Sequence, residues 1–375
     1  MRGFASAFNY LSPDYSWSQV NAIARGRLAN QHLVSPLRTA TGVVRALGAV
    51  QSQDYGSAKW ALAQRASGLT DADVERAFAS GAILRTHVLR PTWHFVLPED
   101  ARWMLELTAP RIRASQAYHE RSLGLATSVF RNSNRLLARA LEGGRQRTRP
   151  ELAVLLRRGG VRAPTGQHVG QLLMRAELDR VIISGPRRGK QFTYALFDDR
   201  VPASPPRDRD EALVDLIRRY FGTRGPATLQ DFAWWSGLTV ADATRGVAAA
   251  GTALERFTED GRAYWHVSSR GARRAARVAH LLPNFDEYVV GFRDRSAVAE
   301  RLLAARPRQR VDGLIGHVVV VDGQIVGGWR RTLGKTLDVQ LQLWVPLSAS
   351  ELDLVRRAAQ RLGRFLGITG VECRP

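Results

Sequence analysis

Apolar residues recur with helical spacing in three successive parts of the chain, and each part ends in two short runs that have the character of strands. In the first part, the helical spacing covers positions 43–47, then 60–62, then 74–78, which predicts helices with one apolar face. Thr70 is a usual N-cap residue, so a helix is expected to begin just after it. Positions 83–96 then predict a β-hairpin that turns near Arg90.

The second part begins with Thr148-Arg149-Pro150-Glu151, a typical helix start with proline in the first turn. Positions 169–178 predict a second helix, and positions 180–197 predict a hairpin. The tip of this hairpin, positions 185–190, carries three cationic side chains. A tip with this charge is expected to lie against phosphates.

The third part begins at Thr228, another N-cap candidate, and its first helix is expected to reach a turn at Gly237. A second helix is predicted over positions 240–249, and a hairpin that turns at Asp260-Gly261 follows. A proline-rich stretch, 201–209, separates the second and third parts and is typical of a linker.

Helix, turn, helix and hairpin in this order are the plan of a winged helix, and the plan occurs three times. We therefore predict a mainly α chain with β-hairpin wings, an α+β fold of tandem winged-helix motifs followed by a C-terminal β-hairpin and helix region. The predicted winged-helix regions are 16–98, 99–200 and 207–275, and the β-rich region with its closing helix is 276–375.

The fourth region departs from the repeated plan because its apolar runs are longer and alternate. Positions 314–321 and 325–331 flank Asp322-Gly323, a strong hairpin signal. A further strand is predicted over 337–345, and an amphipathic helix over 352–366 closes the chain.

The charge of the chain indicates a polyanionic partner. The 375 residues carry a formal net charge of +21, and the sequence pI is about 11.3. A codon bias explains the use of arginine in place of lysine, but it does not explain the excess of basic over acidic residues. Nucleic acid is the favoured partner, and an anionic membrane surface is the alternative.

Cysteine usage and the N-terminal segment indicate a cytoplasmic protein. Cys373 is the only cysteine, which excludes a disulfide framework and a cysteine-based zinc site. The first thirty residues mix charges, among them Arg2 and Asp14, with short apolar pieces, a pattern of neither a signal peptide nor a spanning helix. We expect a cytoplasmic, nucleoid-associated monomer that does not act at a membrane.

Gln51-Ser52-Gln53 is the segment that most clearly indicates a catalytic role. In an extended segment, side chains two positions apart point to the same side, so Gln51 and Gln53 would present two neutral amides to one spot. A carboxamide can orient a water molecule, but it does not titrate near neutrality and is no strong base. The substrate would then need a bond that is easy to cleave. Without further context, two surface or capping amides are the better explanation of the pair.

Metal-dependent chemistry finds little support in the sequence. Only His87 and His94 of the eight histidines lie within ten residues of each other, and we expect them to face each other across the first hairpin. No cysteine or paired carboxylate completes a ligand set, so we predict no metal site. His94 is expected to be packed or to contact DNA.

Acidic residues beside aromatic ones indicate a nuclease as an alternative function. Asp286, Glu287 and Asp294 would suit a nuclease, but no further acidic ligands accompany them at a spacing suited to Mg²⁺. The favoured interpretation is that salt bridges of these residues fix a loop.

Several motifs together resemble the AlkZ-like winged-helix DNA glycosylases, in the order of that family and over residues from about 20 to 365. The first group lies in the first predicted winged helix and the second in the fourth region. The motifs of the first group are Leu47–Tyr55, Ala58–Leu62, Leu84–His87 and Arg90–His94. Those of the second are Leu281–Tyr288, Arg293–Ser296, Asp322-Gly323 and Gly327–Arg331.

The resemblance implies that Gln51 and Gln53 are the catalytic pair of a glycosylase that removes N-alkylated purines, including nitrogen-7 interstrand crosslinks. The family motif has a usually apolar residue between the two glutamines, and Ser52 departs from it. Duplex DNA with alkylated purines is the implied partner, and no cofactor is expected. The candidate DNA contacts are Arg85, His94, Arg187, Arg188, Lys190, Arg293, Arg295, Arg330 and Arg331.

Two neutral amides make chemical sense for this substrate. Alkylation at nitrogen-7 makes the purine cationic and hence a good leaving group, so the amides need only place water at C1′ and stabilise the positive sugar. A lyase reaction would need an activated lysine, and Lys59 is six residues from Gln53. We therefore predict a monofunctional glycosylase that acts without base flipping, since a crosslink resists extrusion. The alternatives are a noncatalytic winged-helix regulator and an assembly scaffold.

Overall fold

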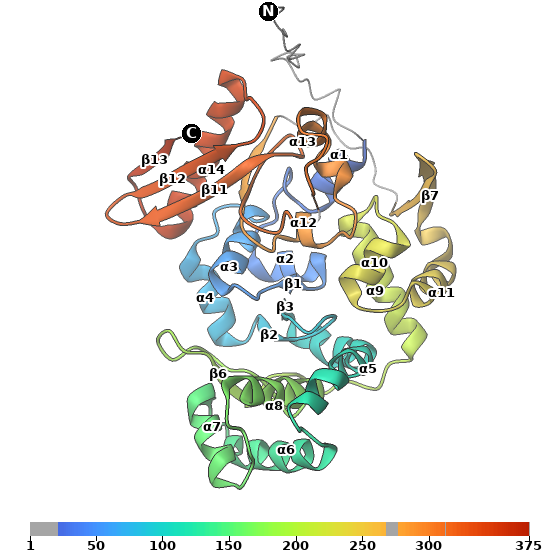
Figure 1. Ribbon diagram of the computed structural model, residues 1–375, viewed down its shortest axis with the longest axis vertical. Helices are drawn as coiled ribbons and strands as arrows, with labels where there is room; N and C mark the ends of the chain where they lie inside the picture. The colour runs from blue at the N-terminus through green and yellow to red at the C-terminus, as the bar shows by residue number, and fades with distance from the viewer. Residues whose placement is uncertain (1–21, 268–276, 312, 375) are drawn as a thin grey trace, which may run out of the picture.

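The computed structural model describes residues 22–267, 277–311 and 313–374. The segment that contains Arg2 and Asp14 and the predicted boundaries at residues 16 and 275/276 lie outside the described residues. Figure 1 shows a lobe around α6–α8, a lobe around α9–α11, and the C-terminal sheet with α14. Helices α2–α4 lie between these parts.

The first region folds as helices followed by a small sheet. Threonines cap two of its helices, since Thr39 Oγ1 accepts from Gly42 N and Thr70 forms a capping box with Asp73. The predicted hairpin is confirmed, and a short strand completes an antiparallel sheet of order β1-β3-β2. The elements are α1 (Ala22–Asn30), α2 (Ala40–Leu47), β1 (Val50–Gln51), α3 (Tyr55–Gln64), α4 (Asp71–Ser80), β2 (Leu84–His87) and β3 (Trp93–Val96).

The second region contains the two predicted helices and hairpin together with two long helices that the sequence analysis did not predict. Thr148 and Glu151 form the expected capping box. Its strands form a sheet of order β4-β6-β5. The elements are α5 (Pro98–Ser122), α6 (Thr127–Leu141), β4 (Arg147–Thr148), α7 (Arg149–Arg158), α8 (Gly166–Leu178), β5 (Ile182–Ser184) and β6 (Thr193–Leu196).

The third region has the predicted helix after Thr228, the turn at Gly237 and the hairpin. An additional helix, α9, precedes them and begins at Arg209, the last residue of the predicted linker. The elements are α9 (Arg209–Arg224), α10 (Leu229–Ser236), α11 (Val240–Ala250), β7 (Glu255–Glu259) and β8 (Arg262–His266).

The C-terminal region is a five-stranded sheet of order β13-β12-β11-β10-β9, covered by α14. The predicted hairpin around Asp322, the following strand and the closing helix are confirmed, whereas β9 and β13 were not predicted. The elements are β9 (Ala279–Leu282), α12 (Glu287–Val290), α13 (Glu300–Ala305), β10 (Val318–Val321), β11 (Gln324–Leu333), β12 (Leu337–Leu343), α14 (Ala349–Leu366) and β13 (Val371–Arg374).

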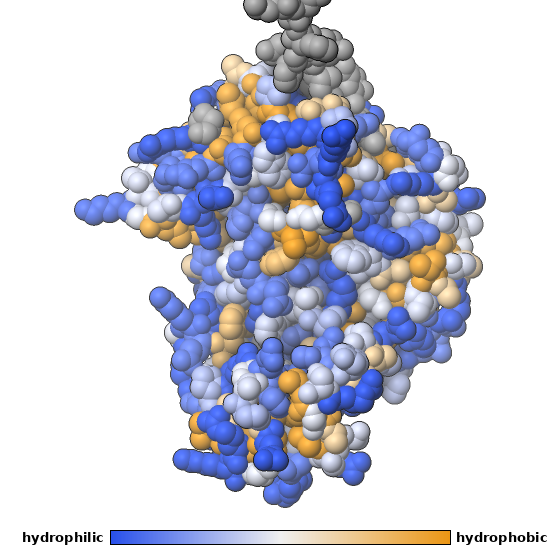
Figure 2. Space-filling model, in the orientation of Figure 1, coloured by the Kyte–Doolittle hydropathy of each residue, from blue (hydrophilic) through white to orange (hydrophobic). Residues whose placement is uncertain are grey.

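The first and fourth regions share one hydrophobic core. Trp60 of α3 is buried, packs against Phe365 of α14 with ring centres 5.1 Å apart, and donates from Nε1 to Leu281 O at 2.7 Å. On the surface, hydrophilic residues dominate the face shown in Figure 2, and apolar residues form scattered patches. Within the described residues, no helix has the length and apolar content needed to cross a membrane.

Candidate active site

The Gln51-Ser52-Gln53 segment joins a strand to a helix. Gln51 ends β1 and is paired with His94 of β3, and Ser52 N donates to Trp93 O at 2.7 Å. Gln53 lies in a bend, after which the Asp54 side chain caps α3 by accepting from Ser57 N. Gln51 is 8% exposed, whereas Gln53 is exposed. Strand β1 therefore ends at Gln51 and does not include Ser52 and Gln53.

A buried carboxylate fixes the backbone of Gln51. Glu287, at the start of α12, is completely buried, and its Oε1 accepts from Gln51 N at 2.8 Å. Its Oε2 accepts from Arg224 Nη2 at 2.6 Å and from Trp235 Nε1 at 3.0 Å. Elements from three regions of the chain thus meet at the backbone of the motif.

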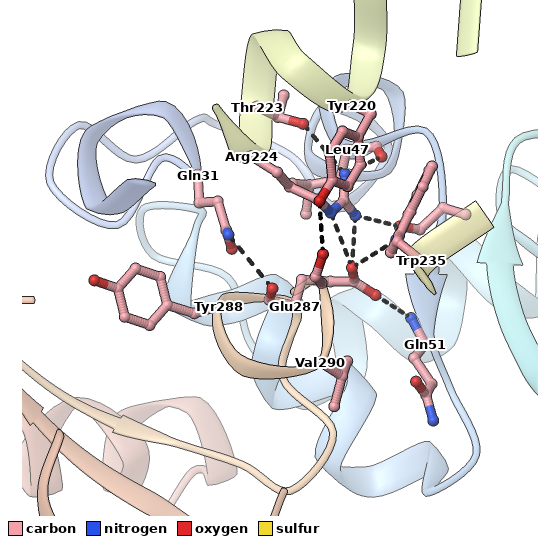
Figure 3. A network of polar contacts seen from close by, with 12 residues as sticks. Gln31, Leu47, Gln51, Tyr220, Thr223, Arg224, Trp235, Glu287, Tyr288 and Val290 are labelled. Atoms are coloured by element: carbon pink, nitrogen blue, oxygen red, sulfur yellow. Dashed lines mark hydrogen bonds and ion pairs between the residues drawn. The ribbon is translucent and has the colours of Figure 1, made fainter. Parts of the chain in front are cut away.

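Arg224, the last residue of α9, extends this support along the chain. Its Nη1 donates to Leu47 O at 2.9 Å and its Nη2 donates to Ala49 O at 3.0 Å. The Arg224–Glu287 ion pair therefore holds the backbone at three alternate positions. In Figure 3 the Gln51 side chain points away from this network, so the network sets the backbone and leaves the carboxamide for other contacts.

Both carboxamide oxygens contact the β2–β3 hairpin. Arg90 Nη2 donates to Gln51 Oε1 at 3.0 Å, and Trp93 N donates to Gln53 Oε1 at a longer distance of 3.4 Å. Each amide oxygen has two lone pairs, so each retains the capacity to accept one more hydrogen bond. The arrangement can orient a water molecule but supplies no acid or strong base of its own.

Comparison with known proteins identifies the family of the chain. The profile of the family described as DNA glycosylase AlkZ-like matches residues 44–365. The chain belongs to the AlkZ-like DNA glycosylase family. A curated relative from Streptomyces sahachiroi, named an interstrand DNA cross-link repair glycosylase, is 28% identical over 378 residues, which cover 96% of this chain and 99% of the relative. The solved structure of the Streptomyces sahachiroi DNA glycosylase AlkZ matches with a TM-score of 0.77 at 24% identity, covering 93% of this chain and 98% of that one.

Ser52 occupies the middle of the AlkZ-like motif and points into the protein. Its side chain is completely buried, and its carbonyl oxygen accepts from Arg85 Nε at 3.1 Å and Nη2 at 3.0 Å. The Arg85 guanidinium lies between the rings of Trp93 and Phe192, 4.3 and 4.4 Å from their centres. Burial explains why an apolar residue suits this position.

Replacing Ser52 by alanine is expected to leave the protein as stable as wild type, or to stabilise it by about 1 kcal/mol. The reason is that Ser52 Oγ is buried and has no hydrogen-bond partner among the described residues. Chemical denaturation of Ser52→Ala and wild type measures the difference. A loss of more than about 1 kcal/mol would show that the hydroxyl makes a stabilising contact.

The acidic residues are engaged in ion pairs. Asp286 receives two hydrogen bonds from Arg65, at 2.7 and 2.9 Å, and Asp294 pairs with Arg262. With Glu287 bound to Arg224, the interpretation of these acids as salt-bridged structural residues is confirmed. Among the described residues, no group of three or more histidine, cysteine or acidic side chains is arranged to hold a metal ion, so the nuclease alternative has no support.

The two histidines of the first hairpin do not face each other, so that expectation was wrong. The register places His87 opposite Trp93 and His94 opposite Thr86. His87 Nδ1 contacts Glu177, while His94 is completely buried with Nδ1 2.9 Å from Thr92 O. Because a carbonyl only accepts, Nδ1 of His94 carries the proton and donates it, which leaves Nε2 unprotonated in the neutral ring.

Burial of the His94 ring lowers its pKa well below the ordinary 6.5, with Arg90 contributing in the same direction. The unfolded chain therefore binds a proton that the folded protein excludes, and stability is lost as pH falls below about 6.5. As the pH falls from 6 to 5, we expect the free energy of unfolding of wild type to decrease by up to about 1.4 kcal/mol more than that of a His94→Asn variant. Equal slopes of unfolding free energy against pH would contradict this.

The nine predicted DNA contacts fall into three groups. Arg85, His94 and Arg295 are buried, so burial removes them from any surface that duplex DNA could reach. Arg187 and Arg188 form ion pairs with Glu75 and Glu151. The remaining four are exposed or half-buried: Lys190, Arg293, Arg330 and Arg331.

Arg331 of β11 lies within electrostatic range of two acidic residues of the first region, Asp54 and Asp71. Burial lowers the pKa of Arg331, and the nearby carboxylates of Asp54 and Asp71 act in the opposite direction. Asp54 directly follows Gln53. Burial lowers the pKa of the half-buried His317, which precedes β10; the charge of Arg331 acts in the same direction and that of Asp54 in the opposite one.

Three residues that support the site were not predicted from the sequence. Arg90 was considered as part of a turn and of a family motif but not as a contact of Gln51, and its position before proline in a hairpin was the available signal. Glu287 was predicted to be a salt-bridged residue that fixes a loop, with a nuclease ligand as the alternative, and not to be a support of Gln51. Arg224 carries no signal in the sequence, because nothing in a helix terminus reveals which distant backbone it will contact.

Proposed function

We propose that the protein is a DNA repair glycosylase that hydrolyses the N-glycosidic bond of N7-alkylated purines, including bulky adducts and interstrand crosslinks. Family membership supports glycosylase activity, and the name of the Streptomyces sahachiroi relative supports the crosslink. The observation that carries the proposal is the anchoring of Gln51. Its backbone is held by a buried ion pair, while its carboxamide is directed away from that pair.

In the proposed reaction, Gln51 and Gln53 hold the attacking water at C1′. Their oxygens accept hydrogen bonds from the water and lie close to the positive charge that develops on the sugar. The alkylated purine leaves without an acid because it is already cationic. Correct placement of the water contributes several kcal/mol, up to about 7–11 kcal/mol in ideal cases.

The proposed enzyme is monofunctional. A lyase would attack C1′ with an amine, but the Lys59 ammonium is engaged by Asp71 at 2.7 Å and by Glu75 at 3.1 Å. These two carboxylates hold the buried lysine in an ion-pair network. We therefore expect the abasic product to retain an intact strand.

Duplex DNA is proposed to bind along tandem winged helices without base flipping. The β5–β6 turn, with the exposed Lys190, and the end of the β11–β12 hairpin both project toward the left edge of the molecule in Figure 1. Arg330, also exposed, lies on the second hairpin. Cations on two projecting hairpins suit contact with separate stretches of phosphate backbone.

The proposal is tested with duplexes that carry one N7-methylguanine or one nitrogen-mustard crosslink. We expect release of the base and unlinking of the strands, with strand cleavage only after alkali. Cleavage without alkali, together with trapping of a covalent complex by borohydride, would show a lyase. Failure to release either adduct, combined with tight binding to one undamaged sequence, would favour a regulator. Absence of salt-dependent duplex binding would favour a scaffold.

A further inference from the structure

Arg90 lies in a tightly wound turn between β2 and β3. Arg90 N donates to Val88 O, and Thr92 N donates to Arg90 O, both at 2.7 Å, so two three-residue turns follow each other. Leu89 has a φ of 66°, which is unfavourable for a residue with a branched side chain. Such strain persists only where the surroundings hold it, and it is concentrated at functional sites.

The surroundings that hold this turn come from the third region and from α5. A Cβ atom at Gly237, which itself has a positive φ, would lie 2.2 Å from Leu89 O, so only glycine allows this approach. Leu89 N donates to Thr108 Oγ1 at 3.2 Å. The turn is therefore fixed on both sides, and its conformation sets the position of the Arg90 side chain next to Gln51.

The charge of Arg90 is not balanced within the described part of the protein. No Asp or Glu there forms an ion pair with Arg90, and its buried Nε has no hydrogen-bond partner. Its guanidinium contacts the Gln51 carboxamide and lies 5.7 Å from the centre of the Trp234 ring. Desolvation lowers the pKa of Arg90, and of the neighbouring charges Glu287 raises it while Arg224 and Arg295 lower it. The Glu287 carboxylate is already bound to Arg224.

We propose that Arg90 binds a phosphodiester oxygen of the DNA strand under attack and, in doing so, releases the Gln51 carboxamide oxygen. The inference rests on the proposed function, since it assigns a backbone contact to the same site. DNA supplies the missing anion, and a guanidinium can form two parallel hydrogen bonds to an anionic phosphate, whereas Gln51 Oε1 is neutral and accepts one bond from Arg90. When DNA binds, the Arg90 guanidinium therefore exchanges the Gln51 carboxamide oxygen for a phosphate oxygen.

The exchange also removes an electrostatic obstacle to the reaction. An uncompensated guanidinium within hydrogen-bond distance of Gln51 opposes a positive charge developing on the adjacent sugar. A phosphate on Arg90 cancels that repulsion at the time the charge develops. The lone pair that Arg90 occupied on Gln51 Oε1 becomes available to the attacking water.

The binding test uses a duplex with an abasic-site analogue and needs no catalysis. Arg90→Gln should reduce the slope of log affinity against log salt by about 0.9. A methylphosphonate at one linkage near the lesion should weaken binding by wild type about tenfold and leave the affinity of Arg90→Gln unchanged. The matched control is Arg356→Gln on α14, which loses an exposed arginine paired with Asp353 and should keep the wild-type response.

The rate test uses the same scan of linkages on an N7-methylguanine duplex at saturating enzyme. When the linkage that binds Arg90 is made neutral, single-turnover base release by wild type should slow, because Arg90 then stays on Gln51. The same neutral linkage should not slow base release by Arg90→Gln. If no linkage distinguishes the variant from wild type in either assay, the inference is overturned. If base release fails in wild type but the binding coupling is present, the phosphate contact stands and the glycosylase proposal falls.

Discussion

Replacing Gln53 by alanine is expected to slow release of 7-methylguanine by roughly 100-fold or more, since the attacking water loses one of its two acceptors. Gln53 is exposed, and its hydrogen bond to Trp93 N is long at 3.4 Å. The substitution should therefore change the free energy of unfolding by less than about 0.5 kcal/mol. Single-turnover assays and chemical denaturation of the same preparation measure both quantities.

The control for this prediction is Gln309→Ala. Gln309 is exposed in the segment after α13, and its side chain donates from Nε2 to the carbonyl of its neighbour Arg310. Its loss should affect neither stability nor base release. Wild-type release by Gln53→Ala would remove Gln53 from the reaction, and a large loss of stability would show that any effect on activity is indirect.

Replacing Glu287 by alanine is expected to cost about 3–5 kcal/mol of stability, because the variant leaves Arg224 buried without its partner. Both side chains of this pair are completely buried, and the pair spans α9 and α12. Gln51 N would lose its acceptor at the same time. Denaturation by urea, followed by base release under conditions where the variant is folded, separates the loss of stability from the loss of alignment.

Asp353→Ala provides the comparison for Glu287→Ala. Asp353 pairs with Arg356 on the exposed surface of α14, where an ion pair contributes about 0–1 kcal/mol. A Glu287 variant that is as stable as this control, and that releases base at the wild-type rate, would contradict the role assigned to the buried pair.

The helix starts of the repeated regions could be predicted because their signals are local. Thr70, Thr148 and Thr228 each form a capping box with the residue three positions later. The hairpin turns at Asp260-Gly261 and Asp322-Gly323 are equally local, since each aspartate and glycine adopts a positive φ. These elements depend on short stretches of sequence and not on the tertiary structure.

Other elements could not be predicted because tertiary contacts define them. Helix α5 contains Pro110 and mixes charged with apolar residues, so it lacks a simple periodic signal. Strand β13 pairs in parallel with β12 after the chain has passed through α14. Nothing in four residues at the end of the chain indicates that partner.

The same distinction applies to the candidate site. Gln51 and Gln53 could be selected from the sequence because only one residue separates them and because they resemble the motif of a family. Their supports could not, since Glu287 is 236 residues from Gln51. The contacts of Arg224 with Leu47 and Ala49 span comparable separations. Burial likewise decided against Arg85, His94 and Arg295 as DNA contacts, and burial is not visible in a charge pattern.

The most direct test of the central claim is single-turnover release of 7-methylguanine from one duplex by wild type, Gln51→Ala, Gln53→Ala and the double variant, with the free base quantified by mass spectrometry. If the two glutamines hold one water as a unit, each single variant is slowed roughly 100-fold or more, and the double variant is little slower than the worse of the two. Release at the wild-type rate by the double variant would contradict the account.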